Sequence, residues 1–161
     1  MKIFLHVSFL FLWLFFGGCA VKKDIQRSDA YLVTIKNPSL AFSDTGFLNH
    51  GKDYTNVQIF SAGTLLFNLE MMGDYICLDG HCLSQTDFNK QFFYHEHYPE
   101  LLHDILNKEP IYHGLALQKT SNGFVQDIEK EGMQIHYAAE GNTLLFRDTK
   151  NHILIRFKPL Q

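Results

Sequence analysis

Two cysteines flank an Asp-Gly pair in the segment from Ile76 to Leu83. Asp79 and Gly80 are a strong signal for a two-residue hairpin turn, because both central positions of that turn need a positive φ, which these residues tolerate. With this turn, Cys77 faces Cys82 in a non-hydrogen-bonded pair of antiparallel strands, which suits a disulfide. The spacing therefore predicts a structural Cys77–Cys82 disulfide that stabilises the fold by about 2 kcal/mol.

Two other interpretations of this pair stay open, namely two buried free thiols and a redox-active couple. The redox interpretation is the weakest, because reactive pairs usually form a C-x-x-C at a helix start, where the thiol pKa is lowered. A disulfide would persist in an oxidising compartment such as the bacterial periplasm.

One cluster of metal-capable side chains stands out in the sequence: His95, Glu96 and His97, with His103 six residues later. Imidazole and carboxylate groups are zinc ligands. However, the segment connects two expected helices and lacks two histidines four residues apart on one helix face. We expect a surface loop that titrates near neutral pH, and we predict no metal site and no cofactor.

Catalytic motifs are absent from the sequence. It contains no G-x-S-x-G, no phosphate-binding glycine loop and no H-E-x-x-H. Asp127 and Glu129 alternate along an expected strand, as solvent-facing residues do. We therefore predict no catalytic residues and a protein that is not an enzyme.

The third cysteine, Cys19, ends an N-terminal signal segment. Lys2 provides a positive start, Ile3 to Phe16 is almost wholly apolar, and Gly17 and Gly18 are the small residues that a signal peptidase requires. The segment resembles a bacterial lipoprotein signal, in which the cysteine is acylated and becomes residue one; an ordinary secretory signal is the alternative. This run of 14 residues is shorter than the roughly 20 residues that a membrane-spanning helix needs.

The expected organisation is a signal peptide over residues 1–18, a lipidated tether over 19–30 and one domain over 31–161. All 17 acidic residues follow the signal, as do all basic residues except Lys2, which leaves a formal charge of −4. No basic stripe is present, so we expect no nucleic-acid partner, and membrane attachment must come from the acyl chains.

Apolar alternation predicts strands before and after a helical middle section. The first group comprises Tyr31–Ile35, Leu40–Phe42, Thr55–Ser61, Thr64–Met71 and the cysteine hairpin. Ser84 is expected to cap a helix over Gln85–Phe93, and Pro99 to begin a second helix that ends at Asn107. The last strands are expected at Phe124–Lys130, Met133–Ala139, Thr143–Asp148 and His152–Pro159, and their short connections require antiparallel neighbours.

This order of elements resembles the LolB type of outer-membrane lipoprotein receptor. The similarity rests on Phe42 to Phe47 as an aromatic-x-x-x-Gly strand entry, on the Leu-rich segment Pro99 to Pro110, and on the closing strands from Phe124 to Phe157. It implies an α+β fold in which a curved antiparallel sheet forms a half-open β-barrel, with two short helices across its concave side. It also implies a monomeric protein on the periplasmic side of the outer membrane.

In that family the concave face holds the acyl chains of lipoproteins, which arrive on a soluble periplasmic carrier. The resemblance thus implies acylated lipoproteins or lipid as partners. The expected acyl-chain pocket consists of Leu65, Phe67, Leu69, Met71, Phe88, Phe92, Leu101, Ile105, Met133, Ile135, Tyr137, Leu144, Phe146, Ile153, Ile155 and Phe157. A filled core made of the same residues is the alternative.

The sequence departs from the family at one functional point. The family reaches the bilayer with a protruding loop that carries an exposed apolar residue, whereas Ala62-Gly63 and Asp79-Gly80 are expected to be tight turns. A second function therefore stays open, that of an envelope lipoprotein of the same fold that binds a protein partner at its sheet edge and carries no lipid.

Overall fold

The computed structural model describes residues 24–160, which form one antiparallel sheet of eleven strands. The strand order across the sheet is β6-β5-β4-β3-β2-β1-β11-β10-β9-β8-β7. Its strands are β1 (Ile25–Asn37), β2 (Leu40–Gly51), β3 (Tyr54–Ser61), β4 (Thr64–Met72), β5 (Tyr75–Leu78), β6 (His81–Ser84), β7 (Leu117–Lys119), β8 (Gly123–Lys130), β9 (Met133–Glu140), β10 (Thr143–Asp148) and β11 (Ile153–Pro159). This sheet joins the two predicted strand groups through β1 and β11.

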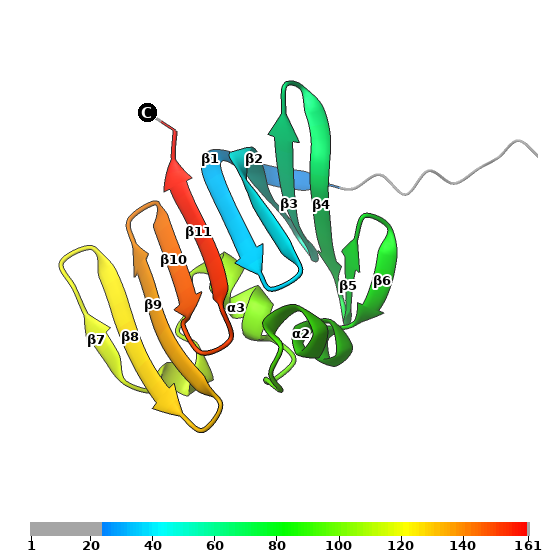
Figure 1. Ribbon diagram of the computed structural model, residues 1–161. Coiled ribbons are helices and arrows are strands. Elements are labelled where there is room, and N and C mark those ends of the chain that lie inside the picture. The colour runs from blue at the N-terminus through cyan, green and yellow to red at the C-terminus, as the bar shows by residue number, and fades with distance from the viewer. Residues whose placement is uncertain (1–23, 161) are drawn as a thin grey trace, which may run out of the picture.

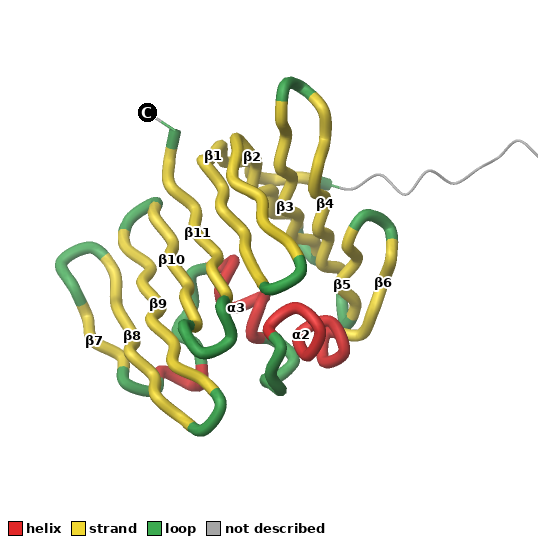
Figure 2. The backbone as a smooth tube through the Cα atoms, in the orientation of Figure 1, coloured by secondary structure: helices red, strands yellow, loops and turns green. Residues whose placement is uncertain are grey.

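Three short helical elements connect the two edges of the sheet: α2 (Gln85–Phe93), α3 (Leu101–Asn107) and the 3-10 turn η2 (Tyr112–Gly114). The chain leaves the sheet after β6, crosses the concave side through these elements, and re-enters at the opposite edge as β7 (Figures 1 and 2). The predicted fold class, an α+β half-open barrel with two short helices across its concave side, is confirmed.

Gly46 in β2 lies where this strand approaches its neighbours β1 and β3 closely. A Cβ at this position would overlap the carbonyl oxygen of Gln58 and a methyl group of Val33, so only glycine allows the strands to approach this closely. β2 pairs with β3 only from Gly46 to His50, although it pairs with β1 along its whole length. The first half of β2 therefore separates from β3, and the sheet closes towards a barrel.

The concave side of the sheet is packed against the helical section. Leu101, Leu102 and Ile105 of α3 are fully buried, as is Phe93 at the end of α2. They share one continuous core with inward-facing residues of both strand groups. Phe93, for example, lies edge-to-face against Phe146 of β10, with 5.6 Å between the ring centroids. This core positions α2 and α3 relative to the sheet.

The structure differs from the expected elements at three strands and one helix. β2 continues to Gly51 instead of ending at Phe42, and α3 begins at Leu101 instead of Pro99. Ile25 to Ala30, predicted to belong to the tether, is the start of β1 and pairs with the end of β2. Most of these residues are polar and all but Asp29 are exposed, so no apolar alternation marks them. β7 was not expected, because its three residues carry no periodic signal.

Candidate functional site

A groove of about 750 Å³ opens between α2, the β5–β6 hairpin and the β1–β2 turn. We call it the α2 groove. Its lining is predominantly apolar and comprises Leu40, Leu78, Leu83, Phe88, Phe92 and Tyr94, with polar atoms from Asn37, Ser39, Asp79, His81, Lys90 and Gln91. Ligand-binding pockets in proteins have volumes of about 300–1,000 Å³ and mostly apolar walls. The α2 groove has both properties.

The predicted cap fixes the start of α2. Ser84 Oγ accepts a hydrogen bond from the backbone N–H of Asp87 at 3.1 Å and donates one to its carboxylate at 2.6 Å. The first bond satisfies a backbone N–H of the first helical turn, and the second orients the Asp87 carboxylate. The helix ends at Tyr94, whose left-handed backbone (φ 55°) turns the chain away and leaves its ring at the groove rim. The predicted bounds of this helix are confirmed.

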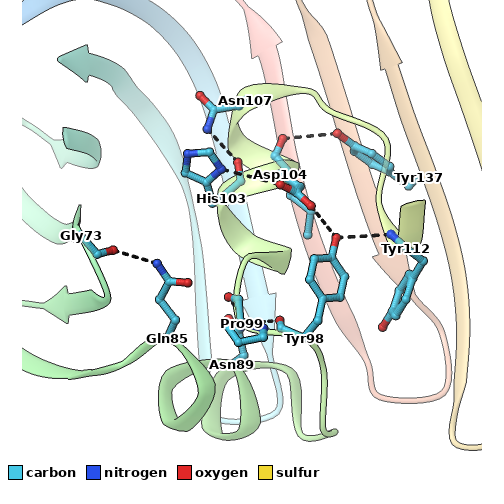
Figure 3. Close-up of polar contacts among 11 residues, drawn as sticks. Gly73, Gln85, Asn89, Tyr98, Pro99, His103, Asp104, Asn107, Tyr112 and Tyr137 are labelled. Atoms are coloured by element: carbon cyan, nitrogen blue, oxygen red, sulfur yellow. Dashed lines mark hydrogen bonds and ion pairs between the residues drawn. The ribbon is translucent and has the colours of Figure 1, made fainter. Parts of the chain in front are cut away.

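Asn89 and Tyr98 attach α2 to the segment before α3, as Figure 3 shows. The buried Asn89 side chain donates from Nδ2 to the carbonyl oxygens of Tyr98 (3.0 Å) and Pro99 (2.8 Å). The Tyr98 hydroxyl donates to Asp104 Oδ2 at 2.7 Å and accepts from the backbone N–H of Tyr112. Burial, together with the Asp104 carboxylate, raises the pKa of Tyr98. The Tyr98 hydroxyl therefore remains protonated and can hold this carboxylate.

The opposite wall of the groove is the disulfide-bonded hairpin. Cys77 pairs directly with Cys82, and the two form the predicted disulfide with a Cα–Cα distance of 3.9 Å. Cys77 is buried and Cys82 is exposed. Leu78 and Leu83, the neighbours of the two cysteines, both line the groove. The disulfide thus constrains the strands that carry the wall.

A charged pair lies at the outer rim. Lys90 Nζ is 2.7 Å from Glu96 Oε1, and both side chains are exposed. The hydrogen bond to Glu96 raises the pKa of Lys90, and the same bond lowers the pKa of Glu96. Surface pairs of this kind contribute little to stability. Lys90 nevertheless places an ammonium group at the mouth of a predominantly apolar groove.

Most of the residues predicted for the acyl-chain pocket are buried in a continuous core, as in the alternative that the sequence left open. One group of predicted residues lies in the closed core rather than along an open space: Phe67, Leu69, Leu101, Ile105, Met133, Ile135, Tyr137, Leu144, Phe146, Ile153, Ile155 and Phe157. Met71 is buried as well, but it lines a second, more polar opening. Phe88 and Phe92 also belong to the core, but they line the α2 groove as well. The physical reason is that α3 brings enough apolar side chains of its own to cover this face.

Leu65 does not face the interior, because the alternation in β4 is interrupted. Ile59 pairs with Phe67 whereas Phe60 pairs with Leu65, so Leu66 is an extra residue in a β-bulge. Leu65 and Leu66 are each 44% exposed near the end of the β3–β4 hairpin. The turn at its end is tight, as expected, but the hairpin extends beyond its neighbours (Figure 1). It projects because β3 pairs with β2 only up to Ile59.

The histidines of the predicted loop do not converge with Glu96 on one point. His95 and His97 are neighbours, with ring centroids 5.2 Å apart, but Glu96 is paired with Lys90. His97 is half-buried, and its Nδ1 is hydrogen-bonded to the Tyr112 hydroxyl. Burial, assisted by His95, lowers the pKa of His97 to about 4. His97 therefore differs from the expected surface group that titrates near neutral pH.

Only Phe88 and Phe92 of the groove lining were among the predicted pocket residues. The apolar lining residues that the prediction missed are Leu40, Leu78, Leu83 and Tyr94. The two hairpin leucines alternate with the cysteines, which was a usable signal for a shared face. No sequence signal distinguishes Leu40, because its position depends on the contact between the β1–β2 turn and α2.

No protein-family model and no curated protein matches this chain. None of the helices within residues 24–160 is long and apolar enough to cross a membrane. Cys19, the predicted lipid-attachment residue, lies outside the described residues.

Proposed function

We propose that this protein is a lipid-anchored envelope protein that binds an acyl chain of a lipoprotein in the α2 groove and aids the localisation of that lipoprotein to the outer membrane. The observation that carries this proposal is the apolar groove beneath α2. Apolar surface that stays open to water favours an apolar ligand, because binding removes that surface from water.

The position of the anchor supports this proposal. Five residues separate Cys19 from Ile25, the first residue of β1. An extended chain spans about 3.5 Å per residue, so an acylated Cys19 would hold the start of β1 within roughly 20 Å of the membrane.

The acyl chains of the cargo set how firmly it stays in a membrane. A single acyl chain holds a protein in a membrane reversibly, whereas two chains anchor it stably. A groove that covers one chain of the cargo lipoprotein would therefore weaken the attachment of that lipoprotein to the membrane.

The β3–β4 hairpin supports the delivery step. Leu65 and Leu66 expose apolar side chains on an element that projects from the sheet. This arrangement is similar to the protruding apolar loop of the LolB type of receptor, although here the projection comes from strand length rather than from a long loop. The hairpin would contact the lipid surface while the cargo chain leaves the groove.

A matched crosslinking experiment tests the binding step in cells. A photo-crosslinking amino acid replaces Tyr94, which is 47% exposed at the groove rim, or Tyr75, which is 59% exposed and does not line the groove. We expect adducts that contain several acylated lipoproteins or phospholipid from position 94, identified by mass spectrometry, and at least fivefold fewer from position 75.

A blocking variant adds a second control. Leu83→Trp should fill part of the groove and reduce the position-94 adducts at least fivefold, whereas Leu115→Trp alters an exposed leucine outside the groove and should not. Equal acyl-bearing adducts from both positions, or adducts insensitive to Leu83→Trp, would contradict the proposal.

The second candidate, a partner-binding lipoprotein without lipid cargo, has one observation in its favour. The sheet is open, and β6 and β7 each have one edge without a neighbouring strand among the described residues. Such edges can pair with a strand of another protein. Capture of one fixed protein and no acyl-bearing adduct would favour this function.

A further inference from the structure

The strand β6 is an edge of the sheet and at the same time a wall of the α2 groove. It is the last strand on its side of the sheet (Figure 1). The side chains of His81 and Leu83 line the groove, whereas Cys82 between them does not. This alternation follows from the two-residue period of a strand, which places every second side chain on the same face. The free edge and the groove are therefore continuous.

The pairing of β6 with β5 decides which of its backbone groups face outward. Opposite residues in antiparallel strands alternate between hydrogen-bonded and non-hydrogen-bonded pairs. The N–H of Gln85 donates to the carbonyl oxygen of Asp74 at 3.0 Å, one position beyond the last pair of the two strands, which joins Tyr75 and Ser84. Counted back from this bond, Ser84 and Cys82 both belong to non-hydrogen-bonded pairs. Their backbone groups therefore point away from β5.

The free edge of β6 thus presents the N–H and C=O groups of Cys82 and the N–H group of Ser84. The Ser84 carbonyl is not counted, because at an N-cap this group accepts the first hydrogen bond of the helix. Within residues 24–160, no strand pairs with this edge. Unpaired backbone groups in a row are a template for a strand of another molecule.

The hairpin that carries this edge is fixed at both ends. Near its turn, the Cys77–Cys82 disulfide joins the two strands. At the other end, Gln85 Nε2 donates to the carbonyl oxygen of Gly73 at 2.8 Å (Figure 3). A preformed edge loses little conformational freedom when a strand is added to it.

The two edges of the sheet differ in how they are protected. Edge strands commonly carry lysine or proline, which discourage pairing with other chains. β6 contains neither residue type, whereas β7 contains Lys119 among its three residues. β7 also contributes nothing to the α2 groove. β6 is therefore the edge that combines free backbone groups with an adjacent apolar groove.

An acyl chain attached to an extended peptide fits both features at once. Side chains directly opposite each other on adjacent strands share a face, and their Cβ atoms lie about 5 Å apart. A cargo residue opposite Leu83 would therefore project beside the groove wall. If this residue is the acylated first cysteine of a lipoprotein, its acyl chain enters the groove. The next cargo residue then lies opposite Cys82 and exchanges two backbone hydrogen bonds with it.

We propose that the free edge of β6 binds the N-terminal segment of the cargo lipoprotein as an added strand, while the acyl chain of its first cysteine occupies the α2 groove. This inference rests on the proposed function and narrows its ligand to an acyl chain on an extended polypeptide. Main-chain hydrogen bonds do not depend on the cargo sequence. The edge would therefore favour lipoproteins of many sequences over a phospholipid with the same acyl chain.

The ligand side of the test compares four synthetic compounds that carry the same palmitoylated cysteine. They are the cysteine amide alone, a pentapeptide in which four polar residues follow that cysteine, and this pentapeptide N-methylated at its residue 2 or at its residue 3. The full chain, with the photo-crosslinking amino acid at position 94, is held in lipid nanodiscs. Because the acyl chain is identical, differences in adduct yield report the peptide backbone.

We expect about tenfold more position-94 adduct from the pentapeptide than from the cysteine amide, because two hydrogen bonds are added. Alternate amides of an added strand face its neighbour. N-methylation should therefore abolish this gain at one of the two positions and preserve it at the other.

The protein side of the test is a pair of variants that both lack the disulfide. Cys77→Ala/Cys82→Pro removes the outward N–H of Cys82, which an edge strand tolerates because this group does not bond to β5. Cys77→Ala/Cys82→Ala is the matched control. The ratio of pentapeptide adduct to cysteine-amide adduct should fall towards one in the proline variant and stay at about ten in the control. Circular dichroism establishes that both variants are folded, and the ligand series decides the matter if the proline variant is not.

The possible failures separate this inference from the proposed function. Equal adducts from the pentapeptide and the cysteine amide, or equal effects of the two N-methylations, would overturn the edge as a binding site and leave the α2 groove as an acyl-chain site. No adduct at position 94 from any of the four compounds would contradict the proposed function itself, and this inference with it.

Discussion

Asn37 Nδ2 donates a hydrogen bond to the carbonyl oxygen of Phe92 at 3.1 Å, and so connects the β1–β2 turn to the last turn of α2. The two residues are 55 positions apart in sequence. Asn37 Oδ1 also accepts hydrogen bonds from the backbone N–H groups of Ser39 and Leu40. One side chain thus shapes the turn and holds the helix that covers the groove.

The substitution Asn37→Asp separates these two roles. Asp keeps the oxygen that accepts from the turn but loses the Nδ2 donor to Phe92. We expect a loss of about 1 kcal/mol in the free energy of unfolding, together with faster amide hydrogen exchange in α2. Urea denaturation and hydrogen exchange check this. Unchanged exchange in α2 would show that this bond does not hold the helix.

Reduction of the Cys77–Cys82 disulfide should weaken both the fold and the groove. The bond closes a short loop, so its loss should lower the free energy of unfolding by about 2 kcal/mol. Because Leu78 and Leu83 flank the two cysteines, acyl-chain crosslinking at position 94 should fall as well. The double variant Cys77→Ala/Cys82→Ala, measured by urea denaturation, should behave as the reduced wild type. A reduced protein as stable as the oxidised one would contradict this role.

Gln126 holds the chain after α3 against β8. Its buried side chain accepts from the N–H of Ile111 at 2.8 Å and donates to the carbonyl oxygens of Ile111 (2.9 Å) and Leu115 (2.7 Å). Gln126→Leu leaves these buried backbone groups without partners, so we expect a loss of roughly 2–4 kcal/mol in stability. Gln118→Leu, in the exposed strand β7, is the control and should change stability by less than about 0.5 kcal/mol.

His97 should make the protein less stable in mild acid. Its pKa is lowered to about 4 in the folded state, whereas an unfolded histidine titrates near 6.5. Above pH 6.5 the ring is neutral in both states and the fold has its full stability. As the pH falls from 6.5 to 4, the unfolded state gains the proton first, and stability decreases by on the order of 2 kcal/mol after allowance for partial exposure.

The variant His97→Gln tests this assignment through the slope of stability against pH. Between pH 6.5 and 4, its unfolding free energy should fall less steeply than that of the wild type, whatever its absolute stability. Parallel slopes for wild type and His97→Gln would assign the acid sensitivity to other groups.

Local signals in the sequence predicted much of this fold. Asp79-Gly80 set the hairpin and the partner of each cysteine, and Ser84 set the start of α2. Each signal acts over a few residues, because turn and cap geometry depends on nearby backbone groups. Ile25 to Ala30 was missed for the same reason: these polar, exposed residues form a strand only because the end of β2 lies beside them.

By itself the sequence determined the cysteine hairpin, the disulfide, the cap of α2 and the apolar face of most strands, although not of β4 at Leu65. The tertiary structure alone decided that β1 pairs with β11, as in Val33 opposite Phe157, and that α3 fills the concave face. It also decided that open apolar surface remains beside α2. The pairing of β1 with β11 joins residues more than 100 positions apart, which no short sequence pattern encodes. Whether a space is filled depends on the volumes of side chains from many elements, and no short pattern encodes this either.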